Sequence, residues 1–96
     1  NLLMTNRHVA EIFASGLGVR QLGFRTGMRA AIDFLREQGR SDQEMLEVRS
    51  IRMIHPYWDM ALLEVEGLAA SHVPLKLSLQ DVGDLDGRRV AVIGYP

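Results

Sequence analysis

Residues 44–54 read EMLEVRSIRMI, and the apolar residues of this stretch change face once along its length. Leu46 and Val48 occupy one face of an extended chain, whereas Ile51 and Met53 occupy the other. A one-residue change of parity is what a β-bulge or a sharp bend produces, and β-barrels use bulges to turn corners. The stretch therefore predicts a long, bent strand of the kind that barrels contain.

In the rest of the chain, short apolar runs alternate with turn-forming residues, a spacing that favours many short strands. Residues 28–37 fit a helix as well as a strand, and we interpret them as a strand. Residues 39–43 are polar and turn-like, and residues 68–86 predict a long connection. Strands are then expected over residues 2–4, 28–37, 44–54, 60–65 and 88–93.

One short helix interrupts this series. Residues 8–14 predict one or two helical turns, with Thr5 or Asn6 as the N-cap and Gly16 as the stop. A helix of this length depends on packing against the rest of the fold. The sequence as a whole predicts an all-β chain with one short helical turn.

Composition limits the classes of function. Ninety-six residues, 47% apolar and 24% charged, form at most one small globular domain. A net charge of −1 lacks the basic excess that binding to nucleic acid or to an anionic membrane requires, and no apolar run is long enough to span a bilayer. The absence of cysteine removes disulfides, thiolate metal sites and a cysteine nucleophile within these residues.

Two residues stand out as candidates for chemistry. His8 follows an apolar strand at the start of a turn, and Asp59 opens the apolar run of residues 60–65. Taken singly, His8 reads as an ordinary surface imidazole and Asp59 as a turn residue that binds backbone N–H groups. Taken together, they suggest an imidazole oriented by a carboxylate, the arrangement used in general-base catalysis.

Other polar and aromatic residues favour structural interpretations. His55 precedes Pro56 in an extended lead-in, His72 is expected to be solvated, and Arg7 is expected to point into solvent. Tyr57 and Trp58 could form a wall beside Asp59, although such a pair more often serves packing. The three histidines lack the spacing of a zinc site, so no metal or other cofactor is predicted.

Three segments resemble trypsin-like serine peptidases. LLMTNRHV at residues 2–9 resembles the segment around that family's catalytic histidine, and DMALL at residues 59–63 resembles the strand bearing its catalytic aspartate. VPL at residues 73–75 with GRRVAVIGYP at residues 87–96 resembles the stretch that follows. The order and spacing match the family, and the pattern around His8 is most similar to bacterial glutamyl-endopeptidase-like and HtrA-like members.

The resemblance implies part of a chymotrypsin-like double β-barrel. Residues 1–80 would form most of the N-terminal barrel, and residues 81–96 a linker and the first strand of the second barrel. Because the chain starts at Asn1 without Met and stops at Pro96 after an apolar run, we expect both ends to be cuts through a larger protein. Many relatives are secreted or periplasmic, but these residues predict no compartment.

The resemblance also implies a serine-type endopeptidase. His8 would be the general base and Asp59 the residue that orients it. None of the five serines lies in the G-[DN]-S-G context of the family's nucleophile, so that serine is expected beyond Pro96 and residues 1–96 alone are expected to be inactive. The expected partners are a peptide or protein substrate and the remainder of the parent chain.

Two alternatives remain open. A catalytically dead trypsin-like domain could serve as a protein-binding module, and a viral-type relative could use cysteine in place of serine. A binding module needs neither His8 nor Asp59, so the presence of both favours an enzyme. The intact Asp59 segment argues mildly against the cysteine type, in which an acidic third residue is dispensable.

Overall fold

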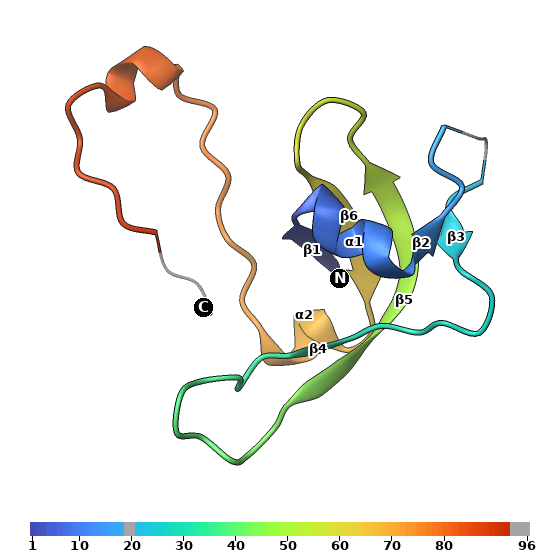
Figure 1. Ribbon diagram of the computed structural model, residues 1–96. Helices are drawn as coiled ribbons and strands as arrows, with labels where there is room; N and C mark the ends of the chain where they lie inside the picture. Colours follow the sequence, from blue (N-terminus) through green and yellow to red (C-terminus); the bar gives the residue numbers. More distant parts are fainter. Residues whose placement is uncertain (19–20, 93–96) are drawn as a thin grey trace.

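The computed structural model describes residues 1–18 and 21–92, and its regular structure is mostly strand (Figure 1). A curled antiparallel sheet, half of a barrel, has the strand order β1 (Leu2–Thr5), β6 (Ala61–Val65), β5 (Met45–Ile54) and β4 (Ala31–Asp33). The short strands β2 (Ala14–Ser15) and β3 (Gly23–Phe24) pair separately. The helices are few and short. This arrangement confirms the all-β prediction. The helices are α1 (Arg7–Phe13), α2 (Leu68–Ser71) and the 3₁₀ turn η1 (Val82–Leu85).

Strand β5 bends as its apolar pattern predicts. Its register against β6 shifts twice, between Val48 and Ser50 and between Ile51 and Met53. Each shift adds one residue to β5, so buried residues recur at every third position: Val48, Ile51 and Ile54. The first shift puts Ile51 on the same buried side as Val48, and the second shift, which was not predicted, does the same for Ile54.

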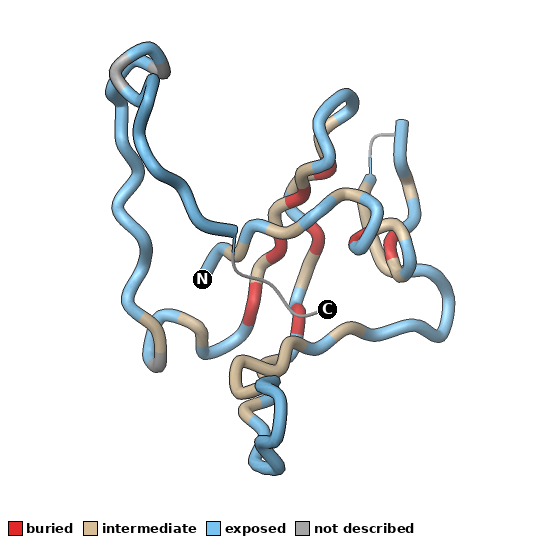
Figure 2. The backbone as a smooth tube through the Cα atoms, turned by 60° about the vertical axis from the view of Figure 1, so that its left-hand side comes forward, coloured by how far each residue is buried: buried red, intermediate tan, exposed pale blue. Residues whose placement is uncertain are grey.

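The core lies between the curled sheet and α1. Figure 2 shows the buried segments gathered mainly on two neighbouring strands, β5 and β6. Strand β6 alternates buried and half-buried side chains along its length, and α1 contributes the fully buried Ala10. No polar or charged side chain is buried among the described residues. The buried set is Ala10, Ala14, Val48, Ile51, Ile54, Ala61, Leu63 and Val65.

The strand expected over residues 28–37 is shorter than predicted. Only Ala31–Asp33 pairs, and it pairs with the beginning of β5. The Asp33 carboxylate then accepts hydrogen bonds from the backbone N–H groups of Leu35 and Glu44, each at 3.0 Å. These two bonds close the turn between β4 and β5, so the strand ends at Asp33, whose carboxylate binds the backbone on both sides of that turn.

The end of the described chain differs from the prediction. Residues 88–92 form no strand, while Ile93 to Pro96 lie outside the described residues. Val90 and Val92 are 90% and 98% exposed, and no described strand lies beside them to complete a hydrogen-bonded ladder. Residues 72–92 instead extend from the sheet as an arm, orange to red in Figure 1. The arm raises the radius of gyration to 15.5 Å, against about 13 Å for a compact domain of this length.

Two further segments differ in detail. The expected connection over residues 68–86 contains α2 and η1. Helix α1 ends at Phe13, because the chain enters β2 directly, and Gly16 forms the turn after β2 rather than the helix stop. Arg25 secures this exit: its backbone N–H donates to the Phe13 carbonyl at 2.8 Å and its Nε to the Ala14 carbonyl at 2.9 Å.

We expect Gly16→Ala to destabilise the protein by about 2–4 kcal/mol. Gly16 has φ +88°, and an added Cβ would overlap the Gln21 carbonyl oxygen. Gly18→Ala is the matched control: φ is +79°, but nothing lies within 4 Å of the added Cβ. The control should cost only about 1 kcal/mol. Urea unfolding of both variants measures the difference, and equal costs would contradict the described turn.

Candidate active site

The pairing of β1 with β6 brings the two predicted site residues together. Thr5 lies opposite Ala61 in this register, so the residues that follow β1 lie beside the residues that precede β6. His8, in the first turn of α1, thereby meets Asp59, at the end of the β5–β6 loop. Fifty-one positions separate them in the sequence.

The Asp59 carboxylate accepts three N–H groups. Its Oδ1 accepts the His8 backbone N–H at 2.9 Å. Its Oδ2 lies 2.7 Å from His8 Nδ1 and accepts the Asn6 side-chain amide at 2.9 Å. These bonds, the His8 backbone N–H first, then Asn6 and the His8 ring, lower the pKa of Asp59 from 3.8 to about 2. Asp59 is therefore ionised throughout the neutral range.

Asp59 also serves the start of α1. Asn6 occupies the N-cap position with extended backbone, as one of the two predicted alternatives had it, but its side chain makes no capping bond. Asp59 instead accepts the N–H of His8, one of the first-turn donors that have no partner inside the helix. A carboxylate near a helix N-terminus is also favoured by the helix dipole. One group therefore fixes both the helix start and the imidazole.

The contact with Asp59 determines the protonation of the His8 ring. An ionised carboxylate only accepts hydrogen bonds, so Nδ1 carries the proton in the neutral imidazole. Nε2 then holds the lone pair, and none of the described residues hydrogen-bonds to it. The side chain is 69% exposed, and that of Asp59 is 50% exposed. Chemically, this is a base held in one tautomer with its free nitrogen open to a reactant.

The loop of residues 55–59 is organised by its own first residue. His55 Nδ1 accepts the backbone N–H groups of Tyr57 at 3.2 Å and Trp58 at 2.9 Å. Its ring stacks on Trp58, with centroids 4.5 Å apart and planes at 9°. Tyr57 and Trp58 are both exposed. His55 is thus a structural residue of the loop that presents Asp59.

Arg7 has a different environment from the one expected. Rather than pointing into solvent, its Nη1 donates to the Pro56 carbonyl at 2.7 Å and lies 3.4 Å from the His55 carbonyl. Its Nε lies 3.0 Å from the Glu11 carboxylate one helical turn later. The side chain is held because three acceptors surround it.

His72 is also more enclosed than predicted. Its ring is half-buried, 4.1 Å from the ring of Phe34 between centroids, and its Nε2 lies 3.9 Å from the Glu44 carboxylate. Within residues 1–18 and 21–92, no three His, Asp or Glu side chains gather closely enough to hold a metal ion. The helices in the same part of the chain are too short and insufficiently apolar to cross a bilayer.

Two of the described serine hydroxyls donate hydrogen bonds to groups other than His8. Ser15 Oγ donates to the Gly23 and Phe24 carbonyls, and Ser50 Oγ donates to Glu64 at 2.8 Å. No described serine hydroxyl hydrogen-bonds to the imidazole. Among the described residues, the His8–Asp59 pair therefore has no hydrogen bond to a serine hydroxyl.

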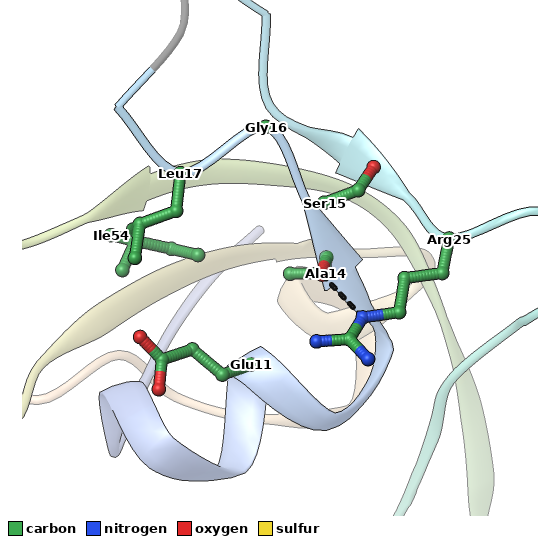
Figure 3. A pocket seen from close by; sticks show the side chains of 7 residues that line it. All are labelled: Glu11, Ala14, Ser15, Gly16, Leu17, Arg25 and Ile54. Carbon is green, nitrogen blue, oxygen red and sulfur yellow. Dashed lines mark hydrogen bonds between the residues drawn. The ribbon is translucent and has the colours of Figure 1, made fainter.

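A cavity of about 330 Å³ lies beside α1 and does not include the pair. In Figure 3, the side chains of Leu17 and Ile54 are drawn on one side of the cavity and that of Arg25 on the other, with Arg25 Nε donating to the Ala14 carbonyl. The volume of this cavity is at the low end for a ligand pocket. Glu11 belongs both to this cavity and to the ion pair with Arg7.

Two contacts of this site, those of Asn6 and Arg7, were not predicted from the sequence. These contacts are the bond from Asn6 to Asp59 and the attachment of Arg7 to the loop. Their position in the sequence could have indicated these contacts. Both residues immediately precede His8, so they lie beside the Asp59 loop once β1 pairs with β6.

We expect Asn6→Ala to raise the pKa of Asp59 from about 2 toward 3.8, because one of its three donors is lost. A lowered pKa means that ionised Asp59 favours the folded state. This contribution is complete above pH 3.8 and is lost as the pH falls through about 2. In the variant the loss begins at the same pH, because the unfolded chain is unchanged, but it is smaller and is complete at a higher pH.

The measurement is a carboxyl ¹³C titration. Asp42, whose pKa is lowered by its hydrogen bond with Arg40, is the internal control and should titrate identically in both proteins. An unaltered Asp59 titration in Asn6→Ala would show that the amide contributes nothing to the carboxylate.

Comparisons with protein-family models, curated proteins and solved structures found no match to this chain.

Proposed function

We propose that this chain is part of a trypsin-like serine endopeptidase, in which His8 is the general base and Asp59 orients it. The observation that carries the proposal is the 2.7 Å contact from His8 Nδ1 to Asp59 Oδ2, made by a carboxylate that also accepts the His8 backbone N–H. The nucleophilic serine would come from sequence outside residues 1–96. The bent β5 and the half-barrel sheet suit the proposed chymotrypsin-like barrel.

The proposed reaction follows from the tautomer. His8 Nε2 takes the serine hydroxyl proton as the oxygen attacks the peptide carbonyl carbon, and the carbonyl electrons move to the oxygen. The imidazolium then gives that proton to the departing amine as the C–N bond breaks, leaving an acyl-enzyme. Water, activated by the same nitrogen, hydrolyses the ester and restores the serine.

The low pKa of Asp59 fits the orienting role. At about 2, this pKa keeps the carboxylate ionised in the neutral range, so Asp59 stabilises the imidazolium as an anion. An exposed ion pair adds little to stability. The contact with the ring therefore has a better explanation in catalysis than in folding, whereas the contact with the backbone N–H serves both.

A serine-directed phosphonylating probe tests the proposal in the full-length protein. We expect the probe to form a covalent bond with one serine outside residues 1–96, and His8→Ala to abolish labelling at short times. His72→Gln is the matched control and should label at the wild-type rate. Residues 1–96 produced alone should neither label nor hydrolyse casein.

The alternative, a catalytically dead domain that binds protein, predicts a different result. Such a domain would bear no reactive serine, and neither labelling nor casein hydrolysis would occur in the full-length protein. Labelling of a cysteine by a thiol-directed probe, in place of a serine, would move the proposal to the cysteine type. Either result would overturn the serine mechanism.

A further inference from the structure

Three consecutive residues attach the start of α1 to the loop that carries Asp59. Asn6 and His8 bind the Asp59 carboxylate itself, while Arg7 binds the loop backbone three residues earlier. Every residue of this triplet therefore meets the segment of residues 55–59. The contacts of Asn6 and His8 define the site, whereas the contact of Arg7 has no role in the mechanism described above.

We propose that Arg7 is a positioning residue for the His8–Asp59 pair. Its guanidinium spans the gap between α1 and the loop, with Nη1 2.7 Å from the Pro56 carbonyl and 3.4 Å from that of His55. Because Arg7 and His8 are adjacent on α1, the link holds the loop at a fixed distance from the imidazole. The proposal rests on the proposed function of that pair.

Glu11 orients the guanidinium for this contact. Its carboxylate lies 3.0 Å from Arg7 Nε, which leaves the Nη1 end of the planar group directed at the carbonyls. The side chains of Arg7 and Glu11 are each only about one-third exposed, 32% and 35%. A rigid fork with several donors can satisfy acceptors on two sides at once, which a single ammonium cannot do equally well.

The loop needs such a link because, among residues 1–18 and 21–92, no other hydrogen bond ties its middle to α1. The bonds from Tyr57 and Trp58 to His55 Nδ1 and the His55–Trp58 stack stay within the loop. They make residues 55–58 a stiff unit without fixing where that unit lies. The described bonds that fix its position relative to α1 are those of Arg7 and those of Asp59 itself.

The test compares Arg7→Met, Arg7→Lys and Arg29→Met in the full-length protein. Methionine keeps most of the apolar stem and removes every donor. We expect Arg7→Met to lower kcat by about 10- to 100-fold with little change in KM, because a shift of about 1 Å in catalytic geometry costs up to about 10²-fold. Arg7→Lys should recover part of the loss. Arg29, an exposed arginine paired with Glu47 at 3.5 Å, is the matched control and should be neutral.

The second readout is the downfield ¹H resonance of the His8 Nδ1 proton, which reports the bond to Asp59 directly. It should weaken or broaden in Arg7→Met and persist in Arg29→Met. A folded Arg7→Met protein with wild-type kcat and an unaltered resonance would overturn the proposal. If Arg7→Met does not fold, Arg7→Lys decides: wild-type kcat and resonance in that variant would likewise overturn it. If the wild-type protein hydrolyses no peptide, the proposed function fails, and the resonance alone still decides the role of Arg7.

Discussion

Replacing His8 by Gln in the full-length protein is expected to reduce kcat by about 10⁶-fold, the cost of removing the base from a complete triad. Glutamine has no basic nitrogen, so nothing takes the serine proton as the bond to the substrate forms. The start of α1 should survive, because Asp59 binds the backbone N–H of residue 8 and the Asn6 side chain, neither of which changes.

Casein hydrolysis and circular dichroism measure the two halves of this expectation. His72→Gln removes a histidine that contacts Phe34 and lies outside the pair, and should leave kcat within about twofold of the wild type. A loss below about 10-fold in His8→Gln, with the fold intact, would remove His8 from the mechanism.

Asp59→Asn has the second largest expected effect, a fall in kcat of about 10⁴-fold with the fold retained. The carboxylate accepts three N–H groups, whereas an amide offers one accepting oxygen and a donating NH₂. If the oxygen keeps the His8 backbone N–H, the NH₂ faces the imidazole. Nδ1 must then accept, the proton moves to Nε2, and the ring can no longer act as a base.

Asp42→Asn is the matched control for this substitution. Asp42 is also a carboxylate with a lowered pKa, but its hydrogen-bond partner is Arg40, in the loop before β5. This variant should keep the wild-type kcat. Near-normal turnover in Asp59→Asn would show that the carboxylate serves only the start of α1.

The bend in the sheet could be predicted because side-chain alternation records directly which face of a strand each residue occupies. The change of parity after Val48 marked a bulge, and the register shifts there. The second shift was missed, because Ile51 and Met53 also fit an undisturbed strand. Strand pairing is harder to predict from the sequence. Val90 and Val92 have a strand-like pattern, but no described strand pairs with them.

The site shows the same division. His8 and Asp59 could be singled out from residue type and position, which already suggested an imidazole oriented by a carboxylate, and the resemblance to trypsin-like peptidases implied their separate roles. Their contact depends on the register of β1 against β6, which no local pattern encodes. The roles of Asn6 and Arg7 depend further on where the β5–β6 loop lies, and long side chains such as arginine can reach many positions.

The tautomer of His8 tests directly whether Asp59 orients the imidazole as a base. In the full-length protein with ¹⁵N-labelled histidine, the resonances of residue 8 can be assigned by their loss in His8→Gln. We expect the neutral wild-type ring to carry its proton on Nδ1 and none on Nε2, and the ring in Asp59→Asn to carry its proton on Nε2. A neutral wild-type ring that carries its proton on Nε2 would contradict this role for Asp59, because that nitrogen could then take no proton from a nucleophile.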